Sequence, residues 1–407
     1  MTVVAGASPA ATLKSLATVR ERCRNITAAV AAGASPHFAL ERDRLAVAAD
    51  RTAAITRERY PTLDVPGHSR WRHFEAGGVD RRKALDRALD GAGTADIARA
   101  EIDLAVVSVL LDAGAGPRWR YVEADTGLSL ARSEGLAIAT LRAFLSGAFS
   151  ARRAEPCRVD AEALIALDVD RMARVFQATP DNPLVGLEGR VALMQRLGRV
   201  LADPAHFGYA ARPGVLFDAL TEDGARSSIG AADIVAALLD RLGPIWLTRR
   251  TVAGAPLGDT WPHPHAGGSG ESAGLVPFHK LTQWLAYSLF EPFQSAGVPV
   301  LDTDALTALP EYRNGGLLLD TGVLALRDPA AATRTHPVGS ELVVEWRALT
   351  VTLIDELAPL VRARLGRPAM PLAAILEGGT WAAGRRIAET LRGGAPPLTI
   401  DSDGTVF

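Results

Sequence analysis

The sequence predicts a mainly α-helical protein with many helices and only minor, short β elements. Three observations lead to this prediction: apolar residues recur at helical spacing over long stretches, Pro and Gly clusters separate these stretches, and strand-like patterns are few. The longest periodic segment, 338–365, places Leu342, Trp346, Leu349 and Leu353 on one stripe. With 407 residues, 48% of them apolar, the chain is long enough for a deep core.

The predicted helices are bounded by residues that typically start and stop helices. Gly33–Pro36 separates the first two, and the third ends before Gly114 and Gly116. The predicted helices cover 10–32, 38–57, 95–112, 130–149, 185–201, 231–242, 277–290, 338–365 and 372–391. Strand signals occur at 118–124 and in the tail 398–407, where Ser402-Asp403-Gly404 predicts a hairpin turn.

Along the chain we expect a disordered N-terminus over 1–9, an N-terminal helical region over 10–180 and a helical domain with the reactive motifs over 181–407. The two helical parts can also form one compact unit. The Pro/Gly-rich segment 253–274 is the most irregular stretch, and loops of that length are usually functional or lie at domain junctions.

The composition and the absence of known motifs argue against several classes of protein. The net charge is −2, so no basic surplus favours a nucleic acid partner or an anionic membrane. No run of 18 apolar residues predicts a membrane span, and no signal-peptide pattern opens the chain. Neither a dinucleotide fingerprint nor a P-loop nor a G-x-S-x-G motif is present. We expect a cytoplasmic protein that uses no cofactor.

Lys280 is the first candidate for chemistry. Of 44 basic residues three are Lys and 41 are Arg, so this position keeps a compact, titratable ammonium in an Arg-rich chain. On a helix Lys280, Gln283, Trp284 and Tyr287 share a polar-aromatic face, whereas Leu281 belongs to the core face. A face of this kind can also be ordinary protein surface.

Glu311 is the second candidate and stands 31 positions after Lys280 (311 minus 280) in a turn. Pro310 can start a helix, and Gly315-Gly316 permit close approach of a ligand. A carboxylate at such a turn can act on a substrate, or it can simply cap the next helix. Arg313 can pair with this carboxylate or bind a phosphate.

The loop Gly258–His265 carries two histidines one residue apart. His263 and His265 are spaced for zinc, but no clear third ligand is nearby, and the neighbouring prolines favour a structured loop that covers a pocket. We therefore expect no metal site and assign Asp259 and Trp261 to substrate contact.

A second cluster combines cationic and aromatic residues over 70–74. Arg70, Arg72 and His73 are candidates for binding a phosphate or a sugar. A surface stacking cluster explains the same pattern equally well.

Three stretches resemble the uracil-catabolism protein family of fungi and bacteria. They are VPGHSRWRHFEAGG at 65–78, LVPFHKLTQWLAYSLFEP at 275–292 and LTALPEYRNGGLLLDTGVL at 306–324. The resemblance extends from about 16 to 386. It implies a place in the route in which uracil, as its nucleotide, is opened to a ribosyl-urea intermediate and yields urea.

The same regions are similar to the queuosine 5′-phosphate hydrolase family, which cleaves an N-glycosidic bond and is related in fold to helix-hairpin-helix DNA glycosylases. Phe278, Lys280 and Gln283 match that family's Phe-x-Lys-Arg-Ala-Gln helix, and the two residues after Lys280 depart from it. Glu311 stands where that family has the catalytic acidic residue of an Asp-Tyr-Arg turn. The similarity implies a helix-hairpin-helix glycosylase-like architecture.

These resemblances imply an N-glycosidic bond hydrolase with Glu311 as catalytic carboxylate and Lys280 as its electrostatic partner. The expected substrate is ribosyl-urea or its 5′-phosphate, cleaved to urea and ribose or ribose phosphate through an oxocarbenium-like transition state. Val344–Ala348 also resembles a helix of the hydrolase family. The residues assigned to substrate binding are Tyr312, Arg313, Trp284, Gln283, Tyr287, Arg70, Arg72, His73, Asp259, Trp261, Glu345 and Arg347.

Two other functions remain open. One is a non-catalytic nucleotide-binding or scaffold protein of uracil degradation. The other is a metal-dependent amidohydrolase that uses His263 and His265.

Overall fold

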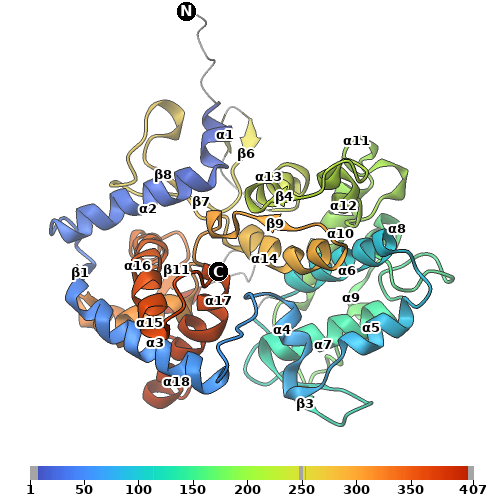
Figure 1. Ribbon diagram of the computed structural model, residues 1–407, viewed down its shortest axis with the longest axis horizontal. Helices are drawn as coiled ribbons and strands as arrows, with labels where there is room; N and C mark the ends of the chain where they lie inside the picture. The colour runs from blue at the N-terminus through green and yellow to red at the C-terminus, as the bar shows by residue number, and fades with distance from the viewer. Residues whose placement is uncertain (1–7, 113, 247–250, 253, 402–407) are drawn as a thin grey trace, which may run out of the picture.

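A computed structural model describes residues 8–112, 114–246, 251–252 and 254–401. Most of these residues lie in helices, which confirms the predicted mainly α class (Figure 1). The helices are α1 (Pro9–Leu13), α2 (Leu16–Ala31), α3 (Leu45–Arg59), α4 (Trp71–Phe74), α5 (Arg82–Ala88), α6 (Thr94–Leu110), α7 (Arg132–Leu145), α8 (Ala161–Ile165), α9 (Val169–Val175), α10 (Leu187–Leu201), α11 (Pro204–Phe207), α12 (Val215–Thr221), α13 (Ala231–Arg241), α14 (Lys280–Ser295), α15 (Tyr312–Asp320), α16 (Glu341–Leu365), α17 (Leu372–Ile375) and α18 (Trp381–Arg392).

The strands are short and occur in pairs throughout the described part of the chain. The pairs are β1 (Phe38–Leu40) with β10 (Leu324–Leu326), β2 (Tyr121–Val122) with β3 (Ser129–Leu130), β4 (Ile229–Gly230) with β9 (Val300–Leu301), β5 (Thr251–Val252) with β6 (Ala255–Pro256), β7 (Thr260–Pro262) with β8 (Leu275–Pro277) and β11 (Thr335–Pro337) with β12 (Thr399–Asp401). The β4–β9 and β11–β12 pairs are parallel, and the others are antiparallel.

Two predicted helices near the N-terminus and the predicted C-terminal hairpin differ from the structure. The expected helix over 10–32 is broken between α1 and α2, where Ser15 adopts an extended conformation. The expected helix over 38–57 begins only at Leu45, because Phe38–Leu40 pairs with a strand far along the chain. The tail strand pairs with β11, and the predicted hairpin turn at 402–404 lies outside the described residues.

One hydrophobic core runs through both predicted helical regions. α16 packs against α2, α3 and α15, and α14 packs against α6 and α13 (Figure 1). The largest cluster of buried apolar residues extends along the chain from Leu16 to Leu398. The division into two regions at residue 180 stays a prediction. The helices of both regions pack around the same core. Residues 1–7 of the expected disordered N-terminus are not described, and Ser8 and Pro9 form the start of α1.

Two glycines bring the C-terminal helices close to the rest of the molecule. A Cβ at Gly384 of α18 would lie 2.1 Å from the carbonyl oxygen of Arg313, so glycine alone allows α18 to contact α15 at this point. The Leu376–Thr380 segment between α17 and α18 is a π-helix, and Gly379 packs it against Thr52 of α3. π-Helical turns often occur at functional sites.

Candidate active site

A cavity of about 390 Å³ forms where α14, α15 and α18 meet α4 and the start of α7. Such a volume suits a small-molecule ligand. The lining residues are His68, His73, Asp112, Gly114, Ala115, Gly116, Pro117, Arg132, Ser133, Lys280, Leu281, Trp284, Leu309, Glu311, Tyr312, Arg313 and Trp381. The cavity brings together the predicted pair Lys280 and Glu311, with four more of the residues assigned to substrate contact.

Glu311 is the N-cap of α15. Its Oε2 accepts the Arg313 backbone N–H at 2.9 Å, and its Oε1 accepts the Asn314 backbone N–H at 2.6 Å. The capping alternative is therefore confirmed. The carboxylate is nevertheless half-buried and lines the cavity, so the cap fixes its orientation at the cavity wall.

Lys280 is the first residue of α14 and lies beside Glu311 in the cavity wall. Its backbone N–H donates to Asp259 Oδ2 at 3.0 Å, and the preceding His279 has a positive φ of 48°, so the helix begins sharply here. Burial lowers the pKa of Lys280 below its ordinary value, and the negative charge of Glu311 opposes part of that change. The predicted electrostatic coupling of this pair has a geometric basis.

Aromatic rings form the walls. The His68 ring lies 4.5 Å from the Trp284 ring, and the His73 ring lies 5.8 Å from it. Trp381 of α18 faces both histidines at 6.2 and 6.3 Å. Trp284 was predicted from its helix face, whereas Trp381 was not.

Arg313 is held between two aromatic side chains. Its guanidinium carbon lies 4.1 Å from the Trp381 ring centre, and its Nε donates to the Tyr312 hydroxyl at 3.0 Å. Tyr312 and Arg313 both line the cavity, as the sequence predicted. Stacking of this kind orients a guanidinium without neutralising it.

A charged cluster forms one side of the cavity. Arg70 pairs with Asp112 at 2.9 Å and contacts His73 Nδ1 at 2.9 Å, and Ser133 donates to Asp112 at 2.5 and 2.6 Å. Burial alone raises the pKa of Asp112, but Arg70, His73 and Ser133 outweigh it and the pKa falls. Burial lowers the pKa of His73 to about 4, with Arg70 acting in the same direction, so His73 is neutral at pH 7.

His68 and Glu377 form a pair that sequence reasoning missed. Glu377 Oε2 lies 2.7 Å from His68 Nδ1, and Arg59 pairs with the other oxygen at 3.0 Å. Burial alone raises the pKa of Glu377, but His68 and Arg59 lower it to about 2, so this carboxylate is ionised. The pair leaves the second ring nitrogen of His68 as the one able to meet a ligand, because His68 lines the cavity.

Arg70 and Arg72 do not line the cavity. The Arg70 side chain is fully buried behind Asp112, so its charge is already paired. Arg72 pairs with Glu291 at 2.7 Å. A direct contact of these two residues with a 5′-phosphate has no support in this geometry, because carboxylates occupy both guanidinium groups.

Gln283 and Tyr287 also lie away from the cavity. Gln283 exchanges hydrogen bonds with Thr307, and the Tyr287 hydroxyl donates to the Thr307 carbonyl at 3.1 Å. Both side chains are buried. Of the predicted polar-aromatic face, only Lys280 and Trp284 therefore line the cavity. Leu281, which was expected in the core, lines it as well.

Asp259, Trp261 and Arg347 form a structural unit beside α14. Arg347 donates to both oxygens of Asp259 at 2.8 and 2.7 Å, and Trp261 Nε1 donates to Asp259 at 2.7 Å. Burial alone raises the pKa of Asp259, but Arg347 outweighs it and the pKa falls. With its oxygens occupied and no place in the cavity lining, Asp259 is poorly situated to protonate a leaving group.

Glu345 is fully buried beneath the histidine loop. It accepts a hydrogen bond from Ser35 and lies 3.5 Å from His263 Nε2, away from the cavity. Within the described residues, no three His, Cys, Asp or Glu side chains come together in a way that could hold a metal ion. His263 and His265 thus lack a third ligand there, and the amidohydrolase alternative lacks a ligand set.

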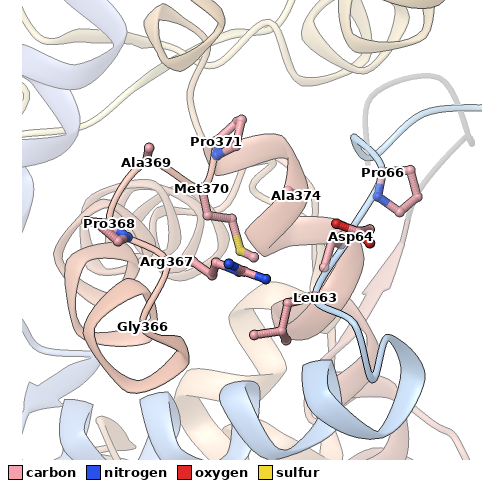
Figure 2. A pocket seen from close by; sticks show the side chains of 11 residues that line it. Leu63, Asp64, Pro66, Gly366, Arg367, Pro368, Ala369, Met370, Pro371 and Ala374 are labelled. Atoms are coloured by element: carbon pink, nitrogen blue, oxygen red, sulfur yellow. The ribbon is translucent and has the colours of Figure 1, made fainter.

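A second hollow, of about 630 Å³, lies at the surface between the loop after α3 and the loop after α16. Figure 2 shows Arg367 and Met370 pointing into it opposite Leu63. Its lining is mostly Pro, Ala and other apolar residues, with Asp64 the sole carboxylate among the residues that line it. The larger hollow has few charged or hydrogen-bonding side chains in its lining, so the smaller cavity is the candidate active site.

The sequence contains only weak indications of the site residues that were not predicted. His68 stands in the stretch 65–78 beside residues that were chosen. Glu377 precedes Gly378-Gly379 inside a helical pattern, where two glycines disfavour a regular helix and suggest a special role. Asp112 lies two residues after the end of α6, just before a Gly-rich stretch.

Comparison with known proteins places the chain in a family. Residues 12–407 match a family described as a protein of unknown function, DUF1688. The chain belongs to this family. Within the DUF1688 family it is similar to Uracil catabolism protein 4 of Lachancea kluyveri, at 38% identity over 98% of this chain and 99% of the relative. It is equally similar to Protein urg3 of Schizosaccharomyces pombe, at 38% identity over 98% of each chain. The resemblance to the uracil-catabolism family is confirmed.

No helix among the described residues is both long and apolar enough to cross a membrane.

Proposed function

We propose that this DUF1688 protein acts in uracil catabolism as an N-ribosyl hydrolase, cleaving ribosyl-urea or its 5′-phosphate to urea and ribose or ribose phosphate. The name of the Lachancea kluyveri relative supports the pathway. One observation carries the reaction: Glu311 and Lys280 line one cavity, with the aromatic rings of Trp284 and Trp381 beside them.

The capped carboxylate suits a cationic transition state. Breaking the bond between the ribosyl carbon and the urea nitrogen develops positive charge on the sugar, and a fixed carboxylate stabilises it without reorganising. Glu311 can then accept a proton from water as the water oxygen bonds to that carbon. Lys280 lies beside the carboxylate in the cavity wall, where its ammonium attracts the negative charge of Glu311.

The leaving group needs a proton, and His68 is placed to supply it. Urea leaves poorly as an anion, so its nitrogen must gain a proton as the bond breaks. A hydrogen bond of 2.7 Å joins His68 Nδ1 to Glu377 Oε2. This bond leaves the other ring nitrogen of His68 available to a ligand in the cavity. In the full cycle one water is consumed: its oxygen joins the sugar, and its two protons restore His68 and complete the sugar hydroxyl.

The first experiment incubates the purified protein with ribosyl-urea and with its 5′-phosphate and measures released urea. We expect release from at least one of them. If the wild-type protein released urea from neither and yet bound them, the non-catalytic binding alternative would replace the enzyme.

A second experiment tests the role of His68. His68→Asn should lower urea release by about 10²- to 10⁴-fold, the usual contribution of general acid catalysis. The same variant should cleave a nitrophenyl riboside nearly as well as the wild type, because nitrophenolate leaves without a proton. Equal losses on both substrates would instead indicate a structural role for His68.

A further inference from the structure

We propose that Arg313, stacked on Trp381, binds a phosphate monoester, so that the substrate of the cavity is a sugar phosphate. This inference rests on the proposed function only for the sugar. The binding of the anion can be tested without any turnover.

Arg313 is a buried cation without an anionic partner. Its side chain is 7% exposed, and Nε donates to the Tyr312 hydroxyl. Nη1 is buried and has no hydrogen-bond acceptor among the described residues, and no carboxylate there forms an ion pair with it. A buried guanidinium in this state is costly, because burial removes water that nothing replaces.

Several other buried arginines of this protein have a carboxylate or backbone carbonyls as partners, although single nitrogens of some, such as Arg70 Nη2, also lack an acceptor among the described residues. Arg70 pairs with Asp112 and Arg81 with Glu123. Arg190 instead donates to backbone carbonyls. Arg313 differs in that it has no carboxylate partner in the described part of the chain and lines the cavity, where its guanidinium stacks on the Trp381 ring. A planar donor fork held in this way fits the oxygens of a phosphate or carboxylate.

The charges around the cavity favour a doubly charged anion over a singly charged one. Arg313, Lys280 and Arg132 line it as cations, against the carboxylates of Glu311 and Asp112. Asp112 is already paired by Arg70, which lies behind it. The described lining therefore has positive charge in excess of what its carboxylates neutralise, as a phosphate dianion requires.

The position of Arg313 relative to Glu311 fits one ligand that reaches both. Both residues belong to the first turn of α15, and the Arg313 backbone N–H donates to Glu311 at 2.9 Å. A sugar phosphate can place its phosphate on the guanidinium while its anomeric carbon faces the carboxylate. Uncharged ribosyl-urea would leave Arg313 unpaired, so we expect the phosphorylated substrate to be preferred.

Thermal shift and calorimetric titration test the site with inorganic phosphate, ribose 5-phosphate, ribose and acetate at constant ionic strength. Phosphate and ribose 5-phosphate should raise the melting temperature of the wild-type protein at about 10 mM, by mass action. Acetate at the same concentration should raise it far less. A wild-type protein that responds to neither phosphate compound overturns the proposal, and an equal response to acetate replaces phosphate with a carboxylate.

Arg313→Met provides the matched test. It should weaken ribose 5-phosphate binding by about 10- to 100-fold, the factor for losing a charge-assisted hydrogen bond, and leave ribose binding unchanged. Without ligand the variant should melt no lower than the wild type, because it removes an unpaired buried charge. A lower melting temperature with retained phosphate binding would make Arg313 a structural residue.

Arg386→Met is the control. Arg386 lies on α18, is exposed and pairs with Glu58, so its loss should change neither phosphate binding nor ribose binding. Failure of the two proposals can be told apart. Phosphate binding without urea release overturns the hydrolase, whereas urea release at equal efficiency from both ribosyl-urea and its 5′-phosphate overturns the anion site.

Discussion

Glu311 is both the N-cap of α15 and the proposed catalytic carboxylate, and three substitutions can separate these roles. Glu311→Ser keeps a good capping residue but removes the carboxylate. Glu311→Gln keeps the length and removes the charge. Glu311→Asp keeps the charge, caps well and shortens the side chain by one methylene.

The geometry sets the expected magnitudes. Glu311 accepts two backbone N–H groups, at 2.9 and 2.6 Å, and a lost cap typically costs about 1 kcal/mol. With an unfolding entropy of about 2 cal/mol/K per residue, that cost lowers the melting temperature of a chain of 407 residues by only about 1–2 °C. Loss of transition-state stabilisation is larger: about 10³-fold in rate corresponds to about 4 kcal/mol.

The assay measures urea release at saturating and limiting substrate, together with thermal unfolding of each variant. We expect Ser and Gln to lose about 10³-fold in kcat although Ser melts like the wild type, and Asp to retain more activity than either. If Glu311→Ser kept the wild-type kcat, the carboxylate would serve as a cap alone and the hydrolytic role would be wrong. Circular dichroism of each variant verifies that the helices are intact.

Three further predictions follow from the same geometry. Burial lowers the pKa of Lys280, so activity should decline with rising pH at a pH below the ordinary pKa of a lysine. Lys280→Arg should move this alkaline decline of the pH–activity profile to higher pH. A decline at an unchanged pH would assign it to another group. His73 has a folded pKa of about 4 and a higher unfolded one, so between about pH 6.5 and 4 the unfolded chain binds more protons and stability falls as pH decreases, by about 3 kcal/mol in total. His73→Asn should flatten this part of a denaturation profile measured across that range, and an unchanged slope would contradict the burial of a neutral ring. Gly384→Ala would place a Cβ 2.1 Å from the Arg313 carbonyl oxygen, so chemical denaturation should register a loss of about 1–3 kcal/mol; a neutral result would mean that α18 and α15 lie further apart.

Helical spacing predicted the local structure well because it reports which side of one helix is apolar. The segments 185–201 and 231–242 became α10 and α13 nearly unchanged. The same spacing says nothing of which distant segment covers that side. Phe38–Leu40 reads as helix by local pattern, but pairing with Leu324–Leu326, nearly 300 positions away, makes it a strand.

Helical spacing also fails to predict which side chains of a helix line the cavity. A stripe over i, i+3, i+4 and i+7 grouped Gln283 and Tyr287 with Lys280, yet Thr307 takes up the hydrogen bonds of both and draws them into the core. Trp381 and Glu377 reach the site because α18 and the π-helical segment before it fold back over α15 and α3. Their place depends on tertiary packing, which one sequence does not reveal.

The cavity concentrates groups that reduce the stability of the folded chain. Arg313 is buried without an anion, His73 is held neutral, and the pKa of Lys280 is lowered by burial. Each of these is unfavourable for folding on its own, since burial without full compensation costs free energy. Elsewhere the same chain pairs many of its buried charges, as Arg81 and Glu123 do at 2.5 Å. Unfavourable groups gathered around one cavity are typical of a site shaped for a ligand.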